Sequence, residues 1–213
     1  MFLSEQMKEK IDVTNKGYIV IEGLCDSNIK LQEQRIEKEN TILYTGSIHK
    51  RYGIKLLVDA FIQADIPNWE LKICGTGDME EDLKNLSNEK VVYLGSIPNE
   101  EACHLQRKAK LLVNPRPTNE DFVKYSFPSK NIEYMASGTP MLTTIIPSMP
   151  KDYYEYIYLI KDESVDGLCS DIKEITQKPD TELEMMGEKA KKFILENKNN
   201  KQQTKKIIDF LKK

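Results

Sequence analysis

Cysteine is scarce in this sequence, and its spacing excludes the common cysteine frameworks. The four cysteines are Cys25, Cys74, Cys103 and Cys169, and no Cys-x-x-Cys pair is present. Zinc knuckles and disulfide scaffolds both need closer and more regular spacing. We therefore expect buried, reduced thiols, and no cluster of metal ligands is evident in the sequence.

Long hydrophobic runs are also absent. The longest apolar stretches cover only a few residues, whereas a membrane-spanning helix needs about 20. The opening residues, MFLSEQMKEK, contain no hydrophobic region of a secretory signal. These absences predict a cytoplasmic protein without a transmembrane segment.

Positive charge is not in excess, since 31 lysines and arginines face 34 aspartates and glutamates, for a net charge of −3. Such a chain has no general electrostatic affinity for nucleic acid or for an anionic membrane, so any basic site must be local. With 39% hydrophobic and 31% charged residues, the apolar side chains must gather in a core, as in a soluble globular protein. At roughly 100–200 residues per domain, the length fits one large domain or one domain with appendages.

Short apolar runs rich in β-branched residues alternate with longer charged segments of helical period from residue 41 to residue 143. This alternation is typical of βα units, so we predict an α/β fold with a Rossmann-like, doubly wound parallel sheet. Strands are predicted at residues 41–46, 69–75, 91–95, 111–115, 140–143 and 156–160. Helices are predicted at residues 53–64, 79–86 with Asp78 as N-cap, 99–108, and 126–137 with Pro128 in the first turn.

Three regions are expected along the chain. Residues 1–40 hold one strand candidate, Tyr18 to Gly23, and a polar run from Asp26 to Asn40 that we expect to be a mobile linker. Residues 41–178 form the Rossmann-like domain. Residues 179–213 form a helical tail whose apolar stripes must pack on another surface.

Two glycine-containing loops follow predicted strands, where α/β sheets bind ligands. The loop from Gly46 to Gly53 carries Lys50 and Arg51, which suit a phosphate. It lacks the G-x-x-x-x-G-K pattern of a P-loop, and a solvated surface loop is the alternative interpretation.

The second loop, Gly75-Thr76-Gly77-Asp78, begins like a dinucleotide fingerprint. Glu80 stands where the third glycine of that fingerprint is required. This difference argues against a nicotinamide cofactor. A tight turn into a helix is the alternative interpretation of the glycines.

The densest group of polar residues lies between Asn114 and Pro140. Three cations lie beside the predicted helix start: Arg116, Lys124 and Lys130. Glu133 lies about one helical turn beyond Ser129, where it can accept hydrogen bonds from a ribose diol while Ser129 and Lys130 face phosphates. The alternative is that Glu133 is a solvated helix residue.

Four segments follow one another in a characteristic order. They are YTGSIHKRYGIKLLVDAF, WELKICGTGDMEEDLKNL, VVYLGSIPNEE and LLVNPRPTNEDFVKYSFPSKNIEYMASGTPML. In this order, residues 41–160 resemble the C-terminal, donor-binding domain of the retaining GT-B glycosyltransferases of family four, the glycosyl transferases group 1. In that family, glycine-rich loops and basic residues hold the donor pyrophosphate, and the second glutamate of an E-x7-E segment holds the ribose.

The resemblance assigns roles to residues by position. Glu133 corresponds to the second glutamate, and Ser129 and Lys130 fall where backbone N–H groups meet pyrophosphate. The expected donor-binding residues are Gly46, Ser47, Gly75, Gly77, Ser129, Lys130 and Glu133. The expected catalytic residues are Arg51, Lys130 and Glu120.

Three positions depart from the family pattern. Ser47 replaces the usual arginine, Tyr52 the usual lysine, and Tyr125 the first glutamate. We expect Arg51 or Lys50 to supply the missing charge and Glu120 the missing carboxylate.

The resemblance implies the nucleotide-sugar-binding half of a retaining glycosyltransferase, which transfers a hexose from a UDP-sugar to a polysaccharide or glycoconjugate. The nucleotide sugar is a substrate, so no cofactor and no metal are expected. The acceptor, a saccharide or a lipid-linked molecule, is expected on a separate N-terminal domain supplied in cis or by a partner chain, with peripheral membrane association through that domain. The alternatives are a non-catalytic, regulatory nucleotide-sugar-binding subunit and a sugar-nucleotide epimerase of GT-B type.

Overall fold

The core of the molecule is a six-stranded parallel sheet with the strand order β3-β2-β1-β4-β5-β6. The structure is a computed structural model that describes residues 1–14, 16–26 and 36–212. Its strands are β1 (Glu39–Thr45), β2 (Glu70–Cys74), β3 (Val91–Gly95), β4 (Ala109–Asn114), β5 (Met141–Thr143) and β6 (Tyr158–Leu159). The order reverses direction between β1 and β4, which is the switch point of a Rossmann-like sheet. The predicted fold class is confirmed.

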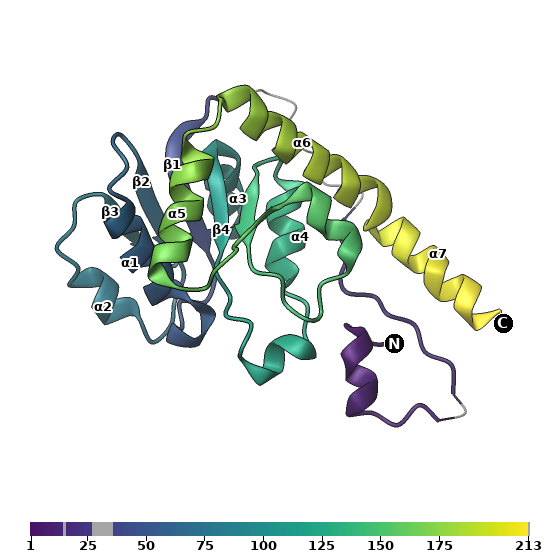
Figure 1. Ribbon diagram of the computed structural model, residues 1–213. Coiled ribbons are helices and arrows are strands. Elements are labelled where there is room, and N and C mark those ends of the chain that lie inside the picture. The colour runs from purple at the N-terminus through teal and green to yellow at the C-terminus, as the bar shows by residue number, and fades with distance from the viewer. Residues whose placement is uncertain (15, 27–35, 213) are drawn as a thin grey trace.

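Helices cover both faces of the sheet (Figure 1). They are α1 (Ile54–Ala64), α2 (Glu80–Lys84), α3 (Asn99–Lys108), α4 (Ser129–Ala136), α5 (Val165–Thr176), α6 (Asp180–Asn197) and α7 (Asn200–Leu211). One half of the core packs α1 and α5 against the sheet, and the other half packs α4 and α6 against its opposite face. This double covering explains why residues 41–45 of β1 and residues 111–114 of β4 are buried at every position, on both faces of the sheet.

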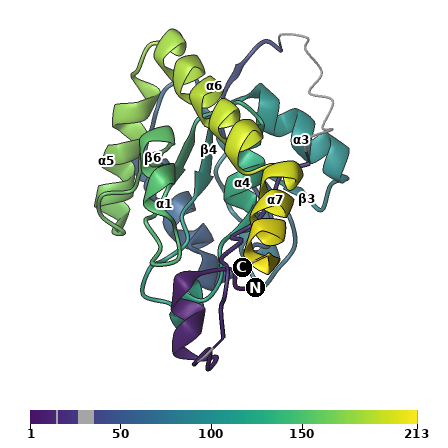
Figure 2. The same ribbon diagram turned by 90° about the vertical axis from the view of Figure 1, so that its right-hand side faces the viewer.

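The C-terminal region is helical, as predicted, and it is interrupted between Asn197 and Asn200. Helix α6 packs on α4, whereas α7 continues beyond the sheet (Figures 1 and 2). The N-terminal segment joins the tail at the interruption. Cys25 N–H donates to the Lys198 carbonyl at 2.9 Å, and Asn200 N–H donates to the Cys25 carbonyl at 2.9 Å.

Several local predictions are wrong. Tyr18 to Gly23 forms no strand beyond an isolated bridge between Phe2 and Val20. The last predicted strand is shortened because a 3-10 helix, η4 (Lys151–Tyr156), precedes β6. Residues 27–35 of the predicted linker lie outside the described residues, and its last two residues belong to β1.

Helix boundaries also differ from the prediction. Helix α4 begins at Ser129, with Pro128 as its N-cap, so the helix does not start at residue 126. Asp78 does not cap α2; its carboxylate accepts from the Lys50 N–H at 2.9 Å and joins two loops instead. Helix α5 was not predicted, although Ser164 caps it by accepting from Gly167 N–H.

The described cysteines are free thiols. Cys25, Cys74 and Cys169 are buried as expected, whereas Cys103 is only half-buried. Among the described helices, none is both long enough and apolar enough to cross a bilayer.

Candidate functional site

The loops after β1 and β2 form one continuous layer at the carboxyl edge of the sheet. Gly46 N–H donates to the Cys74 carbonyl at 2.8 Å, Ile48 N–H to the Thr76 carbonyl at 2.9 Å, and Met79 N–H to the Ile48 carbonyl at 3.2 Å. Because the sheet reverses its order beside β1, this edge is where a ligand binds in such folds.

Two glycines allow these loops to approach each other. Gly75 has a φ of +137°, and a Cβ there would lie 1.7 Å from the Gly46 carbonyl oxygen. A Cβ on Gly77 would lie 2.7 Å from the Ile48 carbonyl. The glycines are therefore required for loop packing, as the tight-turn interpretation expects, whatever ligand the edge binds.

We predict that Gly75→Ala lowers the free energy of unfolding by about 2–3 kcal/mol, because it adds a steric clash to an unfavourable backbone conformation. Gly95→Ala is the matched control, since Gly95 has a φ of +68° but open space around its Cβ. The control should lose only about 1 kcal/mol from the backbone term. Urea unfolding followed by circular dichroism measures both. Equal losses in the two variants would contradict the proposed clash.

Lys130 lies in the first turn of α4 and passes over Gly46. A Cβ on Gly46 would lie 2.4 Å from Lys130 Cε, and Lys130 Nζ lies 5.5 Å from the centroid of the Tyr134 ring. Burial lowers the pKa of the Lys130 ammonium, and the nearby Glu133 carboxylate opposes this effect. A partly desolvated cation at the switch point favours a bound anion.

Glu133 lies one turn after Lys130 on the same helix, half-buried, and accepts a hydrogen bond from Gln106 Nε2. Gln106 is buried on α3 and also donates to Thr45 Oγ1 at 3.1 Å. Thr45 in turn bonds Tyr134 through its backbone, since its N–H donates to the Tyr134 hydroxyl at 2.7 Å. A buried polar network therefore holds Glu133 between β1, α3 and α4.

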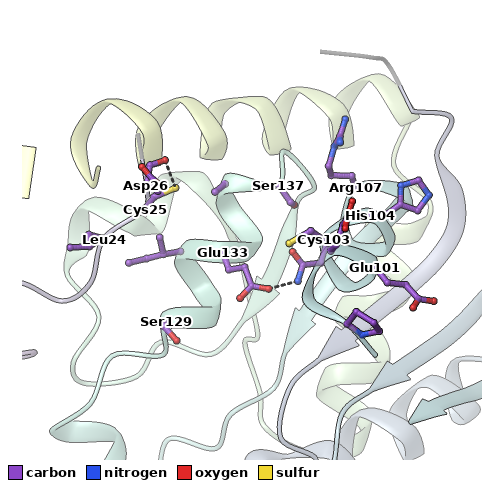
Figure 3. Close-up of a pocket in the computed structure, with 15 residues that line it drawn as sticks. Leu24, Cys25, Asp26, Glu101, Cys103, His104, Arg107, Ser129, Glu133 and Ser137 are labelled. Atoms are coloured by element: carbon purple, nitrogen blue, oxygen red, sulfur yellow. Dashed lines mark hydrogen bonds between the residues drawn. The ribbon is translucent and has the colours of Figure 1, made fainter. Parts of the chain in front are cut away.

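A cavity of about 880 Å³ opens beside Glu133, between α3, α4 and residues 24–26. Figure 3 shows Glu133 reaching from α4 toward α3, with Ser129 at the start of α4 and Cys103 on the α3 side. The volume lies within the range of small-ligand sites. Glu133 presents its carboxylate on one wall, and exposed Ser129 lies near the first turn of the same helix.

Two arginines, one from the loop after β1 and one from the loop after β4, pack against the same two aromatic rings at the switch point. Arg116 lies with its guanidinium carbon 4.6 Å from the Tyr52 ring centroid and 5.4 Å from that of Phe122. Arg51 lies 5.2 Å and 5.5 Å from the same two centroids. Burial lowers the pKa of Arg116. From the sequence, Arg116 is one of three cations beside the predicted helix start, and it is not among the expected site residues.

Of the remaining expected residues, only Arg51 lies at the aromatic rings beside Arg116. Ser47 is exposed, and its carbonyl accepts from the Tyr44 hydroxyl at 2.7 Å. Lys50 is exposed and pairs with Asp82 at 3.2 Å, so of the two proposed replacements only Arg51 lies at the aromatic rings. Within the described residues, the Glu120 side chain makes no hydrogen bond or ion pair.

The structure brings one subset of the expected residues together: Gly46, Gly75, Gly77, Lys130 and Glu133. Sequence reasoning missed Gln106 altogether. In the sequence, Gln106 is an ordinary polar residue of an amphipathic helix. No local sequence pattern predicts its contact with Glu133.

The family described as glycosyl transferases group 1 matches residues 26–193 of the chain. The chain belongs to this family. No curated protein sequence matches it.

Solved glycosyltransferases have the same fold. Sucrose-phosphate synthase from Thermosynechococcus elongatus has a TM-score of 0.74 and 20% identity over 99% of this chain and 57% of its own. The pneumococcal O-GlcNAc transferase GtfA, solved with UDP and GlcNAc, has a TM-score of 0.68 and 18% identity over 97% of this chain and 42% of its own. The C-terminal domain of a group 1 glycosyltransferase from Francisella tularensis has a TM-score of 0.61 and 16% identity over 84% of this chain and 97% of its own. The chain thus spans about half of the longer relatives and nearly all of an isolated C-terminal domain.

Two of the three departures from the family pattern of glycosyl transferases group 1 change the contacts at the site. Tyr52 contributes a ring to the arginine cluster. Tyr125 does not carry a carboxylate into the site; its hydroxyl donates to Glu9 at 3.3 Å, and Lys10 lies over its ring. The position of the family's first glutamate therefore contacts the N-terminal 3-10 helix η1 (Glu5–Glu9) in this chain.

Proposed function

We propose that this chain is the donor-binding half of a retaining glycosyltransferase and that it binds a UDP-sugar at the switch point. The observation that carries the proposal is that one helix places Lys130 over Gly46 and Glu133 on the wall of the cavity. Lys130 offers a cation over Gly46 for the diphosphate. Glu133 offers an acceptor for the ribose hydroxyls, and Gln106 holds that acceptor in place. The UDP in the GtfA structure supports the choice of nucleotide.

The proposed chemistry is electrostatic. When the glycosidic bond to the diphosphate breaks, negative charge grows on the leaving group and the sugar becomes cationic. Cations and N–H donors already in place at Lys130 and at the start of α4 stabilise that charge without reorganising. In this proposal the nucleotide sugar is a substrate, and protein cations balance its diphosphate without a resident cofactor or metal.

We place the acceptor outside this chain's own sheet, on the part of the enzyme that corresponds to the remaining length of the longer relatives. The activity we propose is hexose transfer to a saccharide or lipid-linked acceptor in polysaccharide or glycoconjugate assembly in the cytoplasm. Holding donor and acceptor together is worth about 7–11 kcal/mol of the barrier in favourable cases. That contribution requires both walls of the cleft.

We therefore predict that the 213-residue chain binds UDP weakly and does not transfer sugar by itself. Calorimetric titration tests the first part, and product formation from labelled UDP-sugars tests the second. Adding the acceptor domain, in cis or as a separate chain, should restore transfer. A folded chain that does not bind millimolar UDP would overturn the proposal. Robust sugar transfer by the chain alone would show that the acceptor does not need a separate domain.

A non-catalytic nucleotide-sugar-binding subunit is the second candidate, because Tyr125 faces η1 where the family has a catalytic-site carboxylate. The same assay separates the candidates. A regulatory subunit binds UDP but stays inactive when the acceptor domain is added. Conversion of the labelled donor into a second nucleotide sugar would instead indicate an epimerase.

A further inference from the structure

Arg116 lies directly across the switch point from the loop that follows β1. It is the second residue after β4, and its carbonyl accepts a hydrogen bond from Thr144 Oγ1. The two loops touch, since a Cβ on Gly53 would lie 2.0 Å from the Pro115 carbonyl oxygen. The backbone of Arg116 is therefore held firmly on two sides, and its side chain extends over Tyr52.

The guanidinium of Arg116 lacks partners that a half-buried arginine normally has. Its Nε atom is buried without a hydrogen-bond acceptor, and no carboxylate pairs with the group in the part of the chain that the structure describes. Buried polar atoms are nearly always satisfied, so an orphaned donor needs an explanation. An acceptor supplied by a ligand would satisfy it.

The charges around Arg116 have the same sign. Arg51 lies on the same two rings, and Lys130 is close enough for its pKa to be lowered by the Arg116 charge. Like charges gathered in a partly desolvated place repel one another and are stabilised by a bound anion. The three cations come from three different loops or helix starts, and they face the same edge of the sheet.

We propose that Arg116 binds the diphosphate of the donor and that Tyr52 orients its guanidinium by stacking. The inference rests on the proposed function. In the family pattern, a lysine in the loop after β1, at the position of Tyr52, supplies a cation. In this chain Arg116 supplies the cation from the loop after β4, and Tyr52 places an aromatic ring where the family has the lysine. A planar guanidinium stacked on a ring presents its N–H groups along one edge, which suits a phosphate.

The test compares UDP, UMP and uridine binding by calorimetry in the wild-type chain and in Arg116→Met. We expect the dissociation constant for UDP to rise about tenfold, because a charge-assisted hydrogen bond is lost at a half-exposed site. The uridine affinity should change less than about twofold. Lys55→Met, which removes one exposed cation from α1, controls for net charge and should change neither.

A swap provides the decisive variant. Tyr52→Lys combined with Arg116→Met returns a cation to the β1 side, and we expect it to recover most of the lost UDP affinity. Arg116→Lys keeps the charge without the planar fork and should bind with intermediate affinity, which also covers a failure of Arg116→Met to fold. Equal UDP binding by the wild type and folded Arg116 variants would overturn this inference alone. Absence of UDP binding by the wild type would overturn the proposed function and this inference together.

Discussion

Lys198→Met is expected to lower the free energy of unfolding by about 3–5 kcal/mol, because it leaves a buried carboxylate without its partner. Lys198 Nζ lies 2.5 Å from Glu22 Oε1 and 2.9 Å from Asp152 Oδ2, with the Lys198 and Glu22 side chains only 6% and 5% exposed. The Tyr153 hydroxyl donates to the same Glu22 oxygen at 3.1 Å. This cluster joins the N-terminal segment to the junction of α6 and α7.

Two further variants separate the ion pair from general effects. Lys192→Met removes an exposed cation from α6, where the side chain is 74% exposed, and should cost less than about 1 kcal/mol. Glu22→Gln combined with Lys198→Met removes both charges and should recover part of the loss. Urea unfolding measures all three. A loss in Lys198→Met no larger than in Lys192→Met would show that the pair contributes nothing.

The ion pair also predicts the direction of a pH effect. Burial alone would raise the pKa of Glu22, but the hydrogen bond and charge of Lys198 hold that pKa below 4.5, its ordinary value. A carboxyl with a lower pKa in the folded state stabilises the protein above its unfolded pKa, and this contribution is lost as the pH falls through the folded pKa. The difference in the free energy of unfolding between the wild type and Lys198→Met should therefore be largest at neutral pH. It should become smaller as the pH falls below about 4.5.

Glu133→Ala is expected to weaken UDP binding by about ten- to a hundredfold while leaving pyrophosphate binding unchanged. A carboxylate that accepts from ribose hydroxyls contributes a charge-assisted interaction of roughly 1.5–3 kcal/mol and nothing to the phosphates. Calorimetric titration with UDP and with pyrophosphate separates the two contributions.

Glu101→Ala is the matched control for this prediction. Glu101 also borders the cavity, from α3, but it is exposed and points away from Glu133 (Figure 3). Its loss should change UDP binding by less than about twofold. If Glu133→Ala weakened UDP and pyrophosphate equally, or neither, Glu133 would not be the ribose-binding residue.

The sequence alone determined the architecture of the sheet and one half of the candidate site. Period-two and period-3.6 patterns are local, so they located the strands β1 to β5 and most of the helices. Lys130 and Glu133 are three residues apart on a predicted helix, and residues at that spacing share a face. The sequence alone therefore predicts that these two side chains lie on one face of the same helix.

Only the tertiary structure decided the contacts between residues distant in the chain. Gln106 meets Glu133 from 27 residues away, and Lys198 meets Glu22 from 176 residues away. Arg116 and Tyr52 come together because β1 and β4 are neighbours in the sheet. Propensity and periodicity describe each residue's own segment. They carry no information about which side chain from another segment fills the space beside it, and packing of the whole chain settles that choice.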